Sequence, residues 1–556
     1  MFNLLYLTGL CMQNKLFFPQ RTIKRILFTA FLGLSCQGCQ LIAPYQTPCT
    51  PTPLAWKNTP SSNFPDSWKT EEPSKEADTD RALPNEMPEQ KELNFEECKK
   101  EFEYWWEVFE DSTLSELEKQ ALDSSYTLWA ALERVIQARA VARVDRAALM
   151  PSINFAPSYS RSGMLLENIF AGLLSSQQNQ GQVNAGSSSG AAGAASTSVP
   201  SSFRAVQTQY MLPFDLNYEL DLWYQLTNSY NAAVYSSQAA AQAYLSVLLT
   251  LTADIASNYF QLRDLDTQQV ILKKTIEARQ KALDINRTRF KAGLIVYLDV
   301  SRAEVELARA QADLADVQRL RALQVNILAS LVGVPAPVFT VAFNPLKKPP
   351  PTIPAGLPSD LLYRRPDITE AERSLASAYS QIGVAYASFF PSLNLNATLG
   401  LESPFAHSLF SWKARLWEVG LNVMQSVFDG GRNCANLAYT KSVFRETLAN
   451  YQERVLTAFQ DVEDSLVSIR QRAIQGQALE TAVTAAKETL NLSQMRYDRG
   501  LVNYLDVVDA ERTLLETEQN SAIVLGDRYV ATVRLIKALG GGWGEISYYP
   551  RCWETD

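Results

Sequence analysis

Two stretches of this sequence repeat each other, and this restricts the fold to one that is built twice from the same unit. GLIVYLDVSRAE begins at Gly293 and GLVNYLDVVDAE begins at Gly500, and the two agree at eight of twelve positions. The same spacing of 207 residues (500 − 293) joins Gly333 to Gly540. Self-similarity at a fixed spacing is the signature of a structural duplication. We therefore expect two copies of one supersecondary unit.

Each copy contains long runs that favour uninterrupted helices. The segment Phe214–Ala292 has neither Gly nor Pro, and its helical part approaches roughly 65 residues, or about 100 Å in length. A second such run follows Gly293, and the second copy repeats the design on either side of Gly500. Long helices paired at a glycine predict antiparallel coiled-coil hairpins, with tips at 293–299 and 500–506.

Four shorter segments alternate apolar and polar residues, which is typical of strands with two different faces. In the second of them, leucines and aromatic residues alternate with Asp215, Asn217 and Glu219. An apolar face opposite a face of Asn, Asp and Glu is what a barrel with lipid outside and water inside requires. Strands of a soluble sandwich also alternate, so that alternative stays open. The expected strands are 151–162, 207–222, 391–401 and 418–428.

Four strands are too few to close a barrel, since about eight is the smallest number that does so with a filled interior. Open strand edges in lipid would leave backbone groups unpaired, so several chains must contribute. Two chains would supply eight strands and three would supply twelve. The paired helices would then form a second tube.

The first repeat opens with an aromatic pair followed by a helix. Trp105 and Trp106 are expected to pack in a collar, with a ligand platform as the alternative. The residues from Asp111 onward supply a capping signal for a helix that continues through roughly Leu149.

The N-terminus is typical of a secretory signal, because basic residues between positions 15 and 25 precede the apolar run 26–34. The SCQGC that follows resembles a bacterial lipobox, which predicts a signal peptide over 1–38 and acylation of Cys39. Acylation at Cys36, or a plain signal peptide with an incidental cysteine, are the alternatives. Beyond it, no stretch of about 18 uninterrupted apolar residues predicts a transmembrane helix.

The remaining boundaries follow from composition. Residues 39–102 are rich in Pro, Ser, Glu and Lys and predict an extended, partly disordered tether. The first repeat then covers 103–345 and the second 346–544, followed by a tail over 545–556. Residues 175–202 are almost entirely Gly, Ser, Ala, Gln and Asn and predict a flexible loop.

Composition argues against an enzyme and against a nucleic-acid partner. The net charge of -8 and the pI near 5.2 give no basic footprint for DNA or RNA. The only histidine, His407, lies in a predicted loop without metal-ligand spacing, and the seven cysteines are scattered. No Ser/His/Asp set, Gly-rich phosphate loop or metal cluster can be assembled, so we expect no cofactor and no metal.

Several motifs together resemble one family, the TolC-like outer-membrane efflux proteins, in the lipoprotein branch that includes OprM and NodT. The resemblance covers nearly the whole chain outside 49–98. This chain departs from the family at 221–224, where DLWY replaces the usual DLFG, and at Ser426, where Pro is usual. The motifs are CQLIAPYQTP from Cys39, WWEVFEDSTLSELEKQAL from Trp105, RAALMPSIN from Arg146, YELDLW from Tyr218, RRPDITEAERSLASAYSQIGVAYASFFPSL from Arg364, VFDGGR from Val427 and LGGGW from Leu539.

The resemblance implies a homotrimer with a twelve-stranded barrel in the outer membrane, a periplasmic α-barrel and a collar. It implies the exit duct of a tripartite pump for drugs or other toxic compounds, with a periplasmic adaptor and an inner-membrane transporter of the resistance-nodulation-division type. A duct for protein secretion and a structural coiled-coil surface lipoprotein are the alternative functions.

The resemblance also implies a periplasmic gate at the second tip, where Tyr497, Leu505, Asp506 and Asp509 match positions that line or latch the entrance in relatives. Carboxylates repeated around a narrow bore favour cations. The alternative is that Asp299 and Asp506 are N-caps, with Asp509 in the first turn of its helix.

One charge exchange between the repeats suggests a latch. The position equivalent to Asp509 in the first repeat (509 − 207) is Arg302. We therefore expect Arg302 and Asp509 to pair across neighbouring hairpins and to hold the tips closed.

Overall fold

The structure is a computed structural model that describes residues 41–48, 52–53, 56, 104–165, 204–353, 356, 358 and 361–541. The predicted signal segment 1–38, Cys39, most of the tether, the loop 175–202 and the tail 545–556 lie outside the described residues. The helices and strands, in chain order, are η2 (Trp105–Phe109), α3 (Ser112–Ser124), α4 (Tyr126–Ala148), β1 (Ser152–Phe155), β2 (Ser158–Leu165), β3 (Arg204–Leu220), α6 (Gln225–Lys291), α7 (Tyr297–Val332), η3 (Ala336–Val338), α8 (Leu361–Arg364), α9 (Pro366–Ala387), β4 (Ser392–Ser403), η5 (Ala406–Ser408), η6 (Trp412–Ala414), β5 (Arg415–Met424), α10 (Arg432–Asp498) and α11 (Tyr504–Ala538).

The described chain forms two compact units, and each unit draws on both halves of the duplicated sequence. One unit includes the described residues of 148–228 and 383–433 and contains all five described strands. The other includes those of 45–147, 229–382 and 434–541 and contains most of the helical residues. Each sequence repeat therefore contributes its strands to one compact unit and most of its helical residues to the other.

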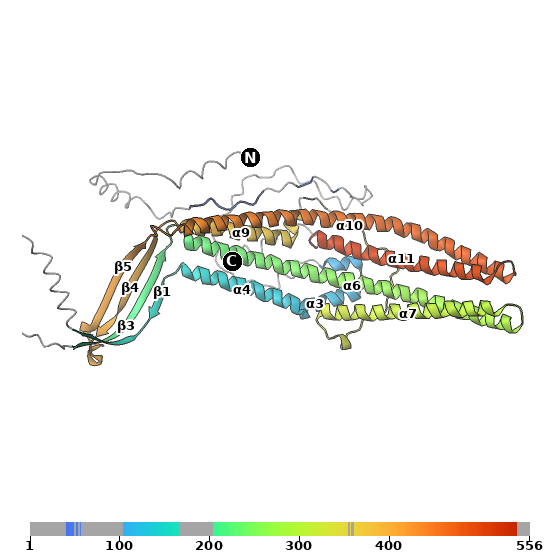
Figure 1. Cartoon of the computed structure of the whole chain (residues 1–556), viewed down its shortest axis with the longest axis horizontal. Coiled ribbons are helices and arrows are strands. Elements are labelled where there is room, and N and C mark those ends of the chain that lie inside the picture. Colours follow the sequence, from blue (N-terminus) through green and yellow to red (C-terminus); the bar gives the residue numbers. More distant parts are fainter. Residues whose placement is uncertain are drawn as a thin grey trace, which may run out of the picture. The chain divides into compact units, whose positions relative to one another are not determined.

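The strands form one antiparallel sheet in the order β1-β3-β4-β5, with β2 also paired to β3 (Figure 1). Directly opposite residues share the same character, and one apolar row contains Phe155, Phe214, Leu399 and Trp417. The adjacent row is polar and contains Asn154, Asp215, Thr398 and Glu418. In this row, Thr398 Oγ1 donates to Asp215 Oδ1 at 2.6 Å. The predicted alternation therefore produces a sheet with one apolar and one polar face.

The first predicted strand, 151–162, is interrupted at Ala156 and Pro157. The pairing register of β1 with β3 nevertheless continues unchanged into β2. Pro157 and, on β3, Pro213 lack an N–H group, so the ladder loses donors on both strands at this level. The interruption thus follows from two prolines, Pro157 and Pro213, that are distant in sequence and become neighbours when β3 pairs with β1 and β2.

Two strands end earlier than the alternating pattern predicted. β3 ends at Leu220 and not at residue 222, and β5 covers Arg415–Met424 in place of 418–428. Leu220 pairs with Leu393 and Met424 pairs with Ser392, which is the first residue of β4. Residues after Met424 would lie beyond the first residue of β4, so they have no partner on that strand. β3 stops one residue short of the same level, at Asp221, whose side chain accepts hydrogen bonds from the N–H groups of Leu226 and Thr227.

The helix expected from Asp111 to Leu149 is two helices, α3 and α4. Its predicted cap is present, because the Asp111 side chain accepts hydrogen bonds from the N–H groups of Thr113 and Leu114. Ser125 is extended between the two helices. The end of α7 packs at this point, where a side chain at Gly333 would lie 2.5 Å from the backbone oxygen of Ser124. A contact distant in sequence therefore breaks the helix.

The long helices pair as the sequence predicted, with α6 antiparallel to α7 and α10 antiparallel to α11 (Figure 1). Both α6 and α10 contain 67 residues, close to the expected length of the first. Helix α6 contains an apolar window that is long enough to cross a membrane, but 56% of that window is buried inside the structure. Core helices of soluble proteins meet the same test, so this window is weak evidence for a membrane span.

The largest apolar core joins η2 and α3 to all four long helices. Trp105 and Trp106 are almost fully buried in it, which confirms that they pack within the core. Phe109 contacts Phe260, with ring centroids 4.7 Å apart, and Phe260 stacks on Tyr529 at 4.5 Å. This core fixes the two hairpins to each other at the end away from their tips.

Candidate functional site: the hairpin tips

The two tips have the same backbone turn at positions 207 residues apart. Gly293 has a φ of +72° and Gly500 a φ of +75°. At each tip, the glycine N–H bonds to the carbonyl oxygen three residues before it and the next N–H bonds to the oxygen five residues before it, all at 2.9 Å. A positive φ is unstrained only for glycine, so these positions allow both helices to end in the same compact turn.

The predicted acidic residues lie just after these turns, inside the following helices. The N-cap positions are Val296 and Asn503, neither of which makes a side-chain capping hydrogen bond. Asp299 and Asp506 occupy the third helical position, so the alternative that they are N-caps is wrong. Asp509 lies in the second turn of α11 and not in the first. The acids at the third position still complement the positive end of the helix dipole.

At the second tip, the predicted gate residues share the exposed side of α11. Leu505, Asp506 and Asp509 are exposed, and the Asp509 side chain retains 61% of its accessible surface. The residues between them face inward, and these are Tyr504, Val507 and Val508. One side of the helix thus holds the hairpins together, and the other side exposes the carboxylates of Asp506 and Asp509 to the surroundings of this chain.

At both tips, acidic and basic side chains pair within one helix. Arg302 Nη1 lies 3.6 Å from Asp299 Oδ1 at the first tip, and Arg512 Nη1 lies 3.6 Å from Asp509 Oδ1 at the second. Among the ion pairs of the described residues, none joins Arg302 to Asp509 within this chain. The predicted pairing therefore remains a prediction for contacts between neighbouring chains.

Below the tips, an apolar cluster joins the two hairpins. It combines side chains from α6, α7 and α11, and its buried members are Leu283, Val300, Ala303, Leu307, Tyr504, Val507 and Val508. Tyr497 packs against this cluster from α10. Each tip also contains an aromatic contact across its turn, with centroids 5.5 Å apart for Phe290 and Tyr297 and 5.4 Å apart for Tyr497 and Tyr504.

A buried ion cluster lies beside these apolar residues and again connects the hairpins. The Glu306 carboxylate on α7 accepts from Arg512 of α11, with Nε at 3.0 Å, and lies 3.3 Å from Arg279 Nη2 of α6. Burial alone would raise the pKa of Glu306, but the hydrogen bond from Arg512 and the charges of both arginines lower it. Burial raises the pKa of the neighbouring Glu511, which lies 3.9 Å from Arg279. Glu306 is thus an ionised carboxylate shared between the hairpins.

A second polar contact between the hairpins lies closer to the tips. Arg289 Nη2 on α6 lies 3.0 Å from Asp498 Oδ1 on α10, and its guanidinium is 5.2 Å from the centre of the Tyr497 ring. Tyr497 Oη in turn donates to Asn286 Oδ1 at 3.3 Å. Burial raises the pKa of Tyr497, so its hydroxyl remains a donor. The predicted latch residue Tyr497 therefore contacts the first hairpin of its own chain.

These contacts between the hairpins were not predicted, although the repeated sequence contains a signal for them. At the positions of the first repeat that are equivalent to Asp498 and Arg512 (207 residues earlier), the sequence has Lys291 and Val305. Where the two hairpins make different contacts, we expect equivalent positions of the two repeats to differ in charge. Applying the comparison used for Arg302 to every tip residue would have selected both positions.

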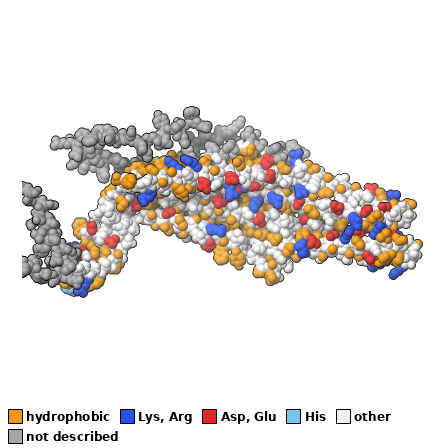
Figure 2. All heavy atoms as spheres, viewed as in Figure 1, with side chains coloured by type: hydrophobic (Ala, Val, Ile, Leu, Met, Phe, Trp, Pro, Cys, Tyr) orange, Lys and Arg blue, Asp and Glu red, His pale blue; other side chains and the backbone are white. Residues whose placement is uncertain are grey.

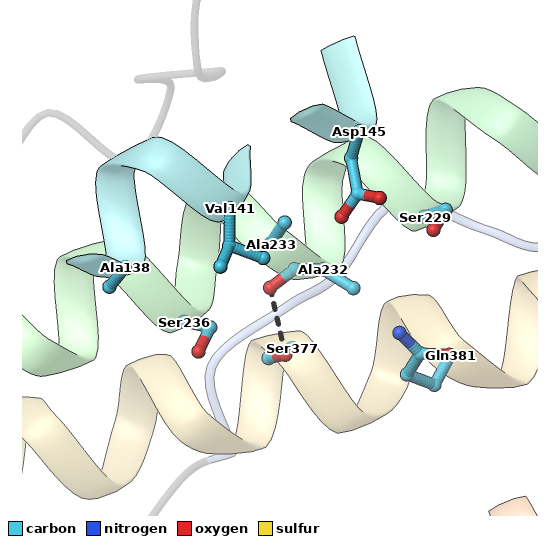
Figure 3. A pocket seen from close by; sticks show the side chains of 9 residues that line it. All are labelled: Ala138, Val141, Asp145, Ser229, Ala232, Ala233, Ser236, Ser377 and Gln381. Carbon is cyan, nitrogen blue, oxygen red and sulfur yellow. Dashed lines mark hydrogen bonds between the residues drawn. The ribbon is translucent and has the colours of Figure 1, made fainter. Parts of the chain in front are cut away.

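The hollow in Figure 3 is a groove between α4, α6 and α9 of about 290 Å³. Small residues line most of it, and Ser377 Oγ donates across it to the backbone oxygen of Ala232 at 2.9 Å. Its other polar side chains include Asp145 and Gln381. Within the described part of the chain, no group of three or more His, Cys, Asp or Glu side chains could hold a metal ion. His407 lies elsewhere, in η5 of the β4–β5 connection, where it is exposed and stacks on Phe405.

Comparisons with known proteins agree on one family. The profile of the family described as outer membrane efflux protein matches residues 117–334 and 357–541. The toluene efflux pump outer membrane protein TtgF of Pseudomonas putida is 31% identical over 523 residues, covering 93% of this chain and 97% of the relative. The pyoverdine export outer membrane protein OpmQ of Pseudomonas aeruginosa is 33% identical over 446 residues, covering 79% of this chain and 87% of the relative.

Solved structures show the same arrangement of helices and strands. The outer-membrane channel OprN superposes with a TM-score of 0.70 at 26% identity, covering 84% of this chain and 98% of OprN.

Proposed function

The chain belongs to the outer membrane efflux protein family, and we propose that it forms, as a homotrimer, the exit duct of a tripartite efflux pump. It has the TolC-like fold of long helices and β-strands, and it is a channel component and not an enzyme. The assembly, the gate and the partners described below are proposals that extend this family membership.

The two-faced sheet is the observation that carries the proposal. Its apolar side is uncovered by any described part of the chain, and more than half of each side chain is exposed for Ile153, Phe155, Phe214, Leu399, Trp417, Val419, Leu421 and Val423. The opposite side carries Asp, Asn, Thr and Glu. Such a sheet suits a wall between hydrocarbon and water.

No described strand pairs with either outer edge of this sheet, which supports an assembly of several chains. One edge is β5 and the other is the line of β1 and β2. Because unpaired backbone groups are prohibitive in lipid, each edge needs a strand from another chain. Three chains with four strand positions each would close a barrel of twelve strands.

The helices also expose apolar side chains that another chain would cover. Tyr126, Trp129 and Val144 on α4 are each more than half exposed, as are Tyr439 and Leu456 on α10. Apolar residues on several helices of one water-exposed protein favour contacts between subunits. The helices of three chains would then form a periplasmic α-barrel.

The gate is proposed at the second tip. In a trimer, the exposed side chains of Leu505, Asp506 and Asp509 would repeat three times around the narrow end of the tube, and Tyr497 would restrain the hairpin from behind. Rings of carboxylates favour cations. A pairing of Arg302 with Asp509 of a neighbouring chain would hold this end closed.

The apolar surface of both tips supports a periplasmic partner. Leu294, Val296, Tyr297, Leu298 and Leu501 are each more than half exposed. We propose that they bind the adaptor protein, which in turn connects the duct to an inner-membrane transporter of the resistance-nodulation-division type. Names of relatives include toluene, antibiotic and pyoverdine pumps, which supports small organic compounds as substrates.

Contacts of the residues after Cys39 support a lipid anchor. Ile42 lies against α9 beside Asn228, where a side chain at Gly383 would collide with it. Tyr45 contacts the rings of Tyr235 and Tyr379 at centroid distances of 6.4 and 5.8 Å. Cys39 precedes Ile42 by three residues in the sequence, so we propose that acyl groups on Cys39 would anchor this part of the chain to the membrane.

The proposal is tested by placing a charge on either face of the sheet. Leu399→Glu puts a carboxylate on the apolar face, and Asn396→Glu puts the same group on the polar face of the same strand, opposite the uncharged Asn217 and Gly420. We expect the full-length Leu399→Glu protein to lose membrane-inserted trimers and single-channel conductance, and Asn396→Glu to retain both. Equal behaviour of the two variants, or a monomeric wild type, would refute the membrane duct.

A further inference from the structure

The β4–β5 connection, residues 404–414, is a compact loop at the strand ends that do not lead into helices. Ser403 Oγ contacts Ser408 Oγ at 2.6 Å and accepts from the N–H of Phe405 at 3.2 Å. Leu409 and Ala414 are buried beneath it. The loop therefore presents its remaining side chains from a defined backbone.

Those side chains include large aromatic residues that nothing in the described structure covers. Phe405 is 60% exposed, Phe410 81% and Trp412 77%. Trp417 begins the apolar face of β5 three residues beyond the loop and is 76% exposed. The aromatic surface of the loop therefore continues the side of the sheet that we assign to lipid.

Basic side chains accompany these aromatic residues. The Arg415 guanidinium stacks on Trp412, with Cζ 3.3 Å from the ring centre, and Arg415 Nε donates to the Trp412 carbonyl oxygen at 2.9 Å. Lys413 is exposed beside them. Neither cation makes an ion pair with a described residue, and the segment 403–417 contains no Asp or Glu although the chain has a net charge of -8. In Figure 2, basic side chains gather at the free end of the sheet.

We propose that this loop binds the phosphate groups of lipids in the outer leaflet, through Lys413 and Arg415 with Trp412 at the level of the headgroups. Aromatic rings with one apolar and one polar side prefer the membrane interface. Clustered cations beside them attract anionic headgroups. The stacking on Trp412 fixes the Arg415 guanidinium, whose donors match phosphate geometry. This inference rests on the proposed membrane duct, because only insertion brings the loop to a lipid surface.

The test uses the full-length protein in detergent and counts bound lipid by native mass spectrometry. The probe is a bisphosphorylated lipid A, with its dephosphorylated form and inorganic phosphate as comparisons. The variant carries Lys413→Gln and Arg415→Gln. The control carries Lys274→Gln and Lys281→Gln, which removes two exposed charges from α6.

We expect the loop variant to bind the phosphorylated lipid about tenfold more weakly, while the control variant binds it as the wild type does. Removal of the phosphates from the lipid should weaken binding to the wild type by a similar factor. Equal binding by the loop variant and the wild type would overturn the site, and equal binding of inorganic phosphate and lipid would overturn its lipid character.

Channel conductance separates this inference from the proposed function. The loop variant should conduct as the wild type does, because its substitutions lie outside the proposed gate. A wild type that binds lipid A but forms no channel would refute the duct and leave the lipid contact standing. A conducting wild type that discriminates neither lipid nor variant would refute only the loop site.

Discussion

The two hairpin tips share one backbone and differ in charge. Their glycines differ by 3° in φ (75 − 72), and their turn hydrogen bonds match in length. Asp299 at the first tip is largely buried beside Arg302, whereas the side chain of Asp509 at the second tip is 61% exposed. The two repeats thus share the backbone turn that reverses the chain, while the charge and exposure of the side chains around it differ.

The corners where strands lead into helices also share a backbone feature between the two repeats. Asp221 accepts hydrogen bonds from the N–H groups of Leu226 and Thr227, and Asp429 accepts from those of Gly431 and Asn433. These backbone N–H groups lower the pKa of Asp429, so it remains a capping anion. Capping by an Asp is therefore common to both repeats.

The largest expected effect comes from breaking the ion cluster that joins the hairpins. Glu306→Gln leaves the buried Arg279 without its full counter-charge, and loss of one partner of a buried pair costs about 3–5 kcal/mol. We expect a fall of that size in the free energy of unfolding, measured by denaturant titration in detergent. Glu304→Gln is the control, because the ion pair of Glu304 with Arg287 is about half exposed at both ends and should contribute less than about 1 kcal/mol. Equal losses would mean that the cluster does not join the hairpins.

A pH-dependent effect distinguishes the long helices α6 and α10. Burial raises the pKa of Asp264 to about 7, opposed by a hydrogen bond from Gln268 and assisted by Asp527. The equivalent position in α10 (264 + 207) is the exposed Gln471. Because the folded pKa exceeds the unfolded one, stability from the neutral Asp264 is present below about pH 4 and is lost as the pH rises to about 7.

We therefore expect the thermal midpoint of the wild type to fall relative to that of Asp264→Asn between about pH 4 and 7, and the difference to stay constant above. Gln471→Asp serves as the control, since an exposed carboxylate should add no such dependence. Parallel midpoints for Asp264→Asn and the wild type across this range would show that Asp264 is ionised throughout.

A smaller effect is expected at the corners. Tyr224 has a φ of +57° at the corner of the first repeat, whereas two glycines have positive φ at the corner of the second, Gly430 at +65° and Gly431 at +89°. A side chain in this region costs about 1–2 kcal/mol, part of which the entropy of glycine offsets. Tyr224→Gly should therefore stabilise the protein by up to about 1 kcal/mol, and Gly430→Ala should destabilise it by a similar amount. Thermal unfolding measures both, and a destabilised Tyr224→Gly would mean that contacts of the tyrosine ring outweigh the strain.

The smallest effect on stability is expected for the pair closest to the tips. Arg289 and Asp498 are 30% and 49% exposed, so Arg289→Gln should lower stability by less than about 1 kcal/mol. The resting conductance should nevertheless rise, because this pair joins the two hairpins beside the proposed gate. The swapped variant Arg289→Asp with Asp498→Arg should restore the low conductance, and a swap that stays leaky would refute the pairing.

Local patterns predicted the elements of this fold, and long-range contacts set their ends. The alternation across β3 and β4 correctly placed Asp215 and Thr398 on the polar face, because a two-residue period is a property of a single strand. The break at Ser125 depends on Gly333, and the end of β5 depends on the first residue of β4. Neither Gly333 nor the first residue of β4 can be identified from the local sequence of the element that it ends.

The same limit applies to the site. The glycines at the tips follow from the repeated motif, since chain reversal is local. Glu306 has Thr513 at the equivalent position of the second repeat (306 + 207), but its contacts with Arg279 and Arg512 on two other helices cannot be read from the sequence. Buried ion pairs between distant segments become visible only once the helices are packed.

Single-channel conductance in planar bilayers most directly tests whether the second tip is the gate. The variant Asp506→Asn with Asp509→Asn should lose cation selectivity and change the resting conductance, because it removes the proposed carboxylate rings. Asp299→Asn should leave selectivity unchanged, since the Asp299 side chain is only 17% exposed, against 61% for that of Asp509. If both variants retained the selectivity of the wild type, or if only Asp299→Asn altered it, the assignment of the gate to the second tip would be wrong.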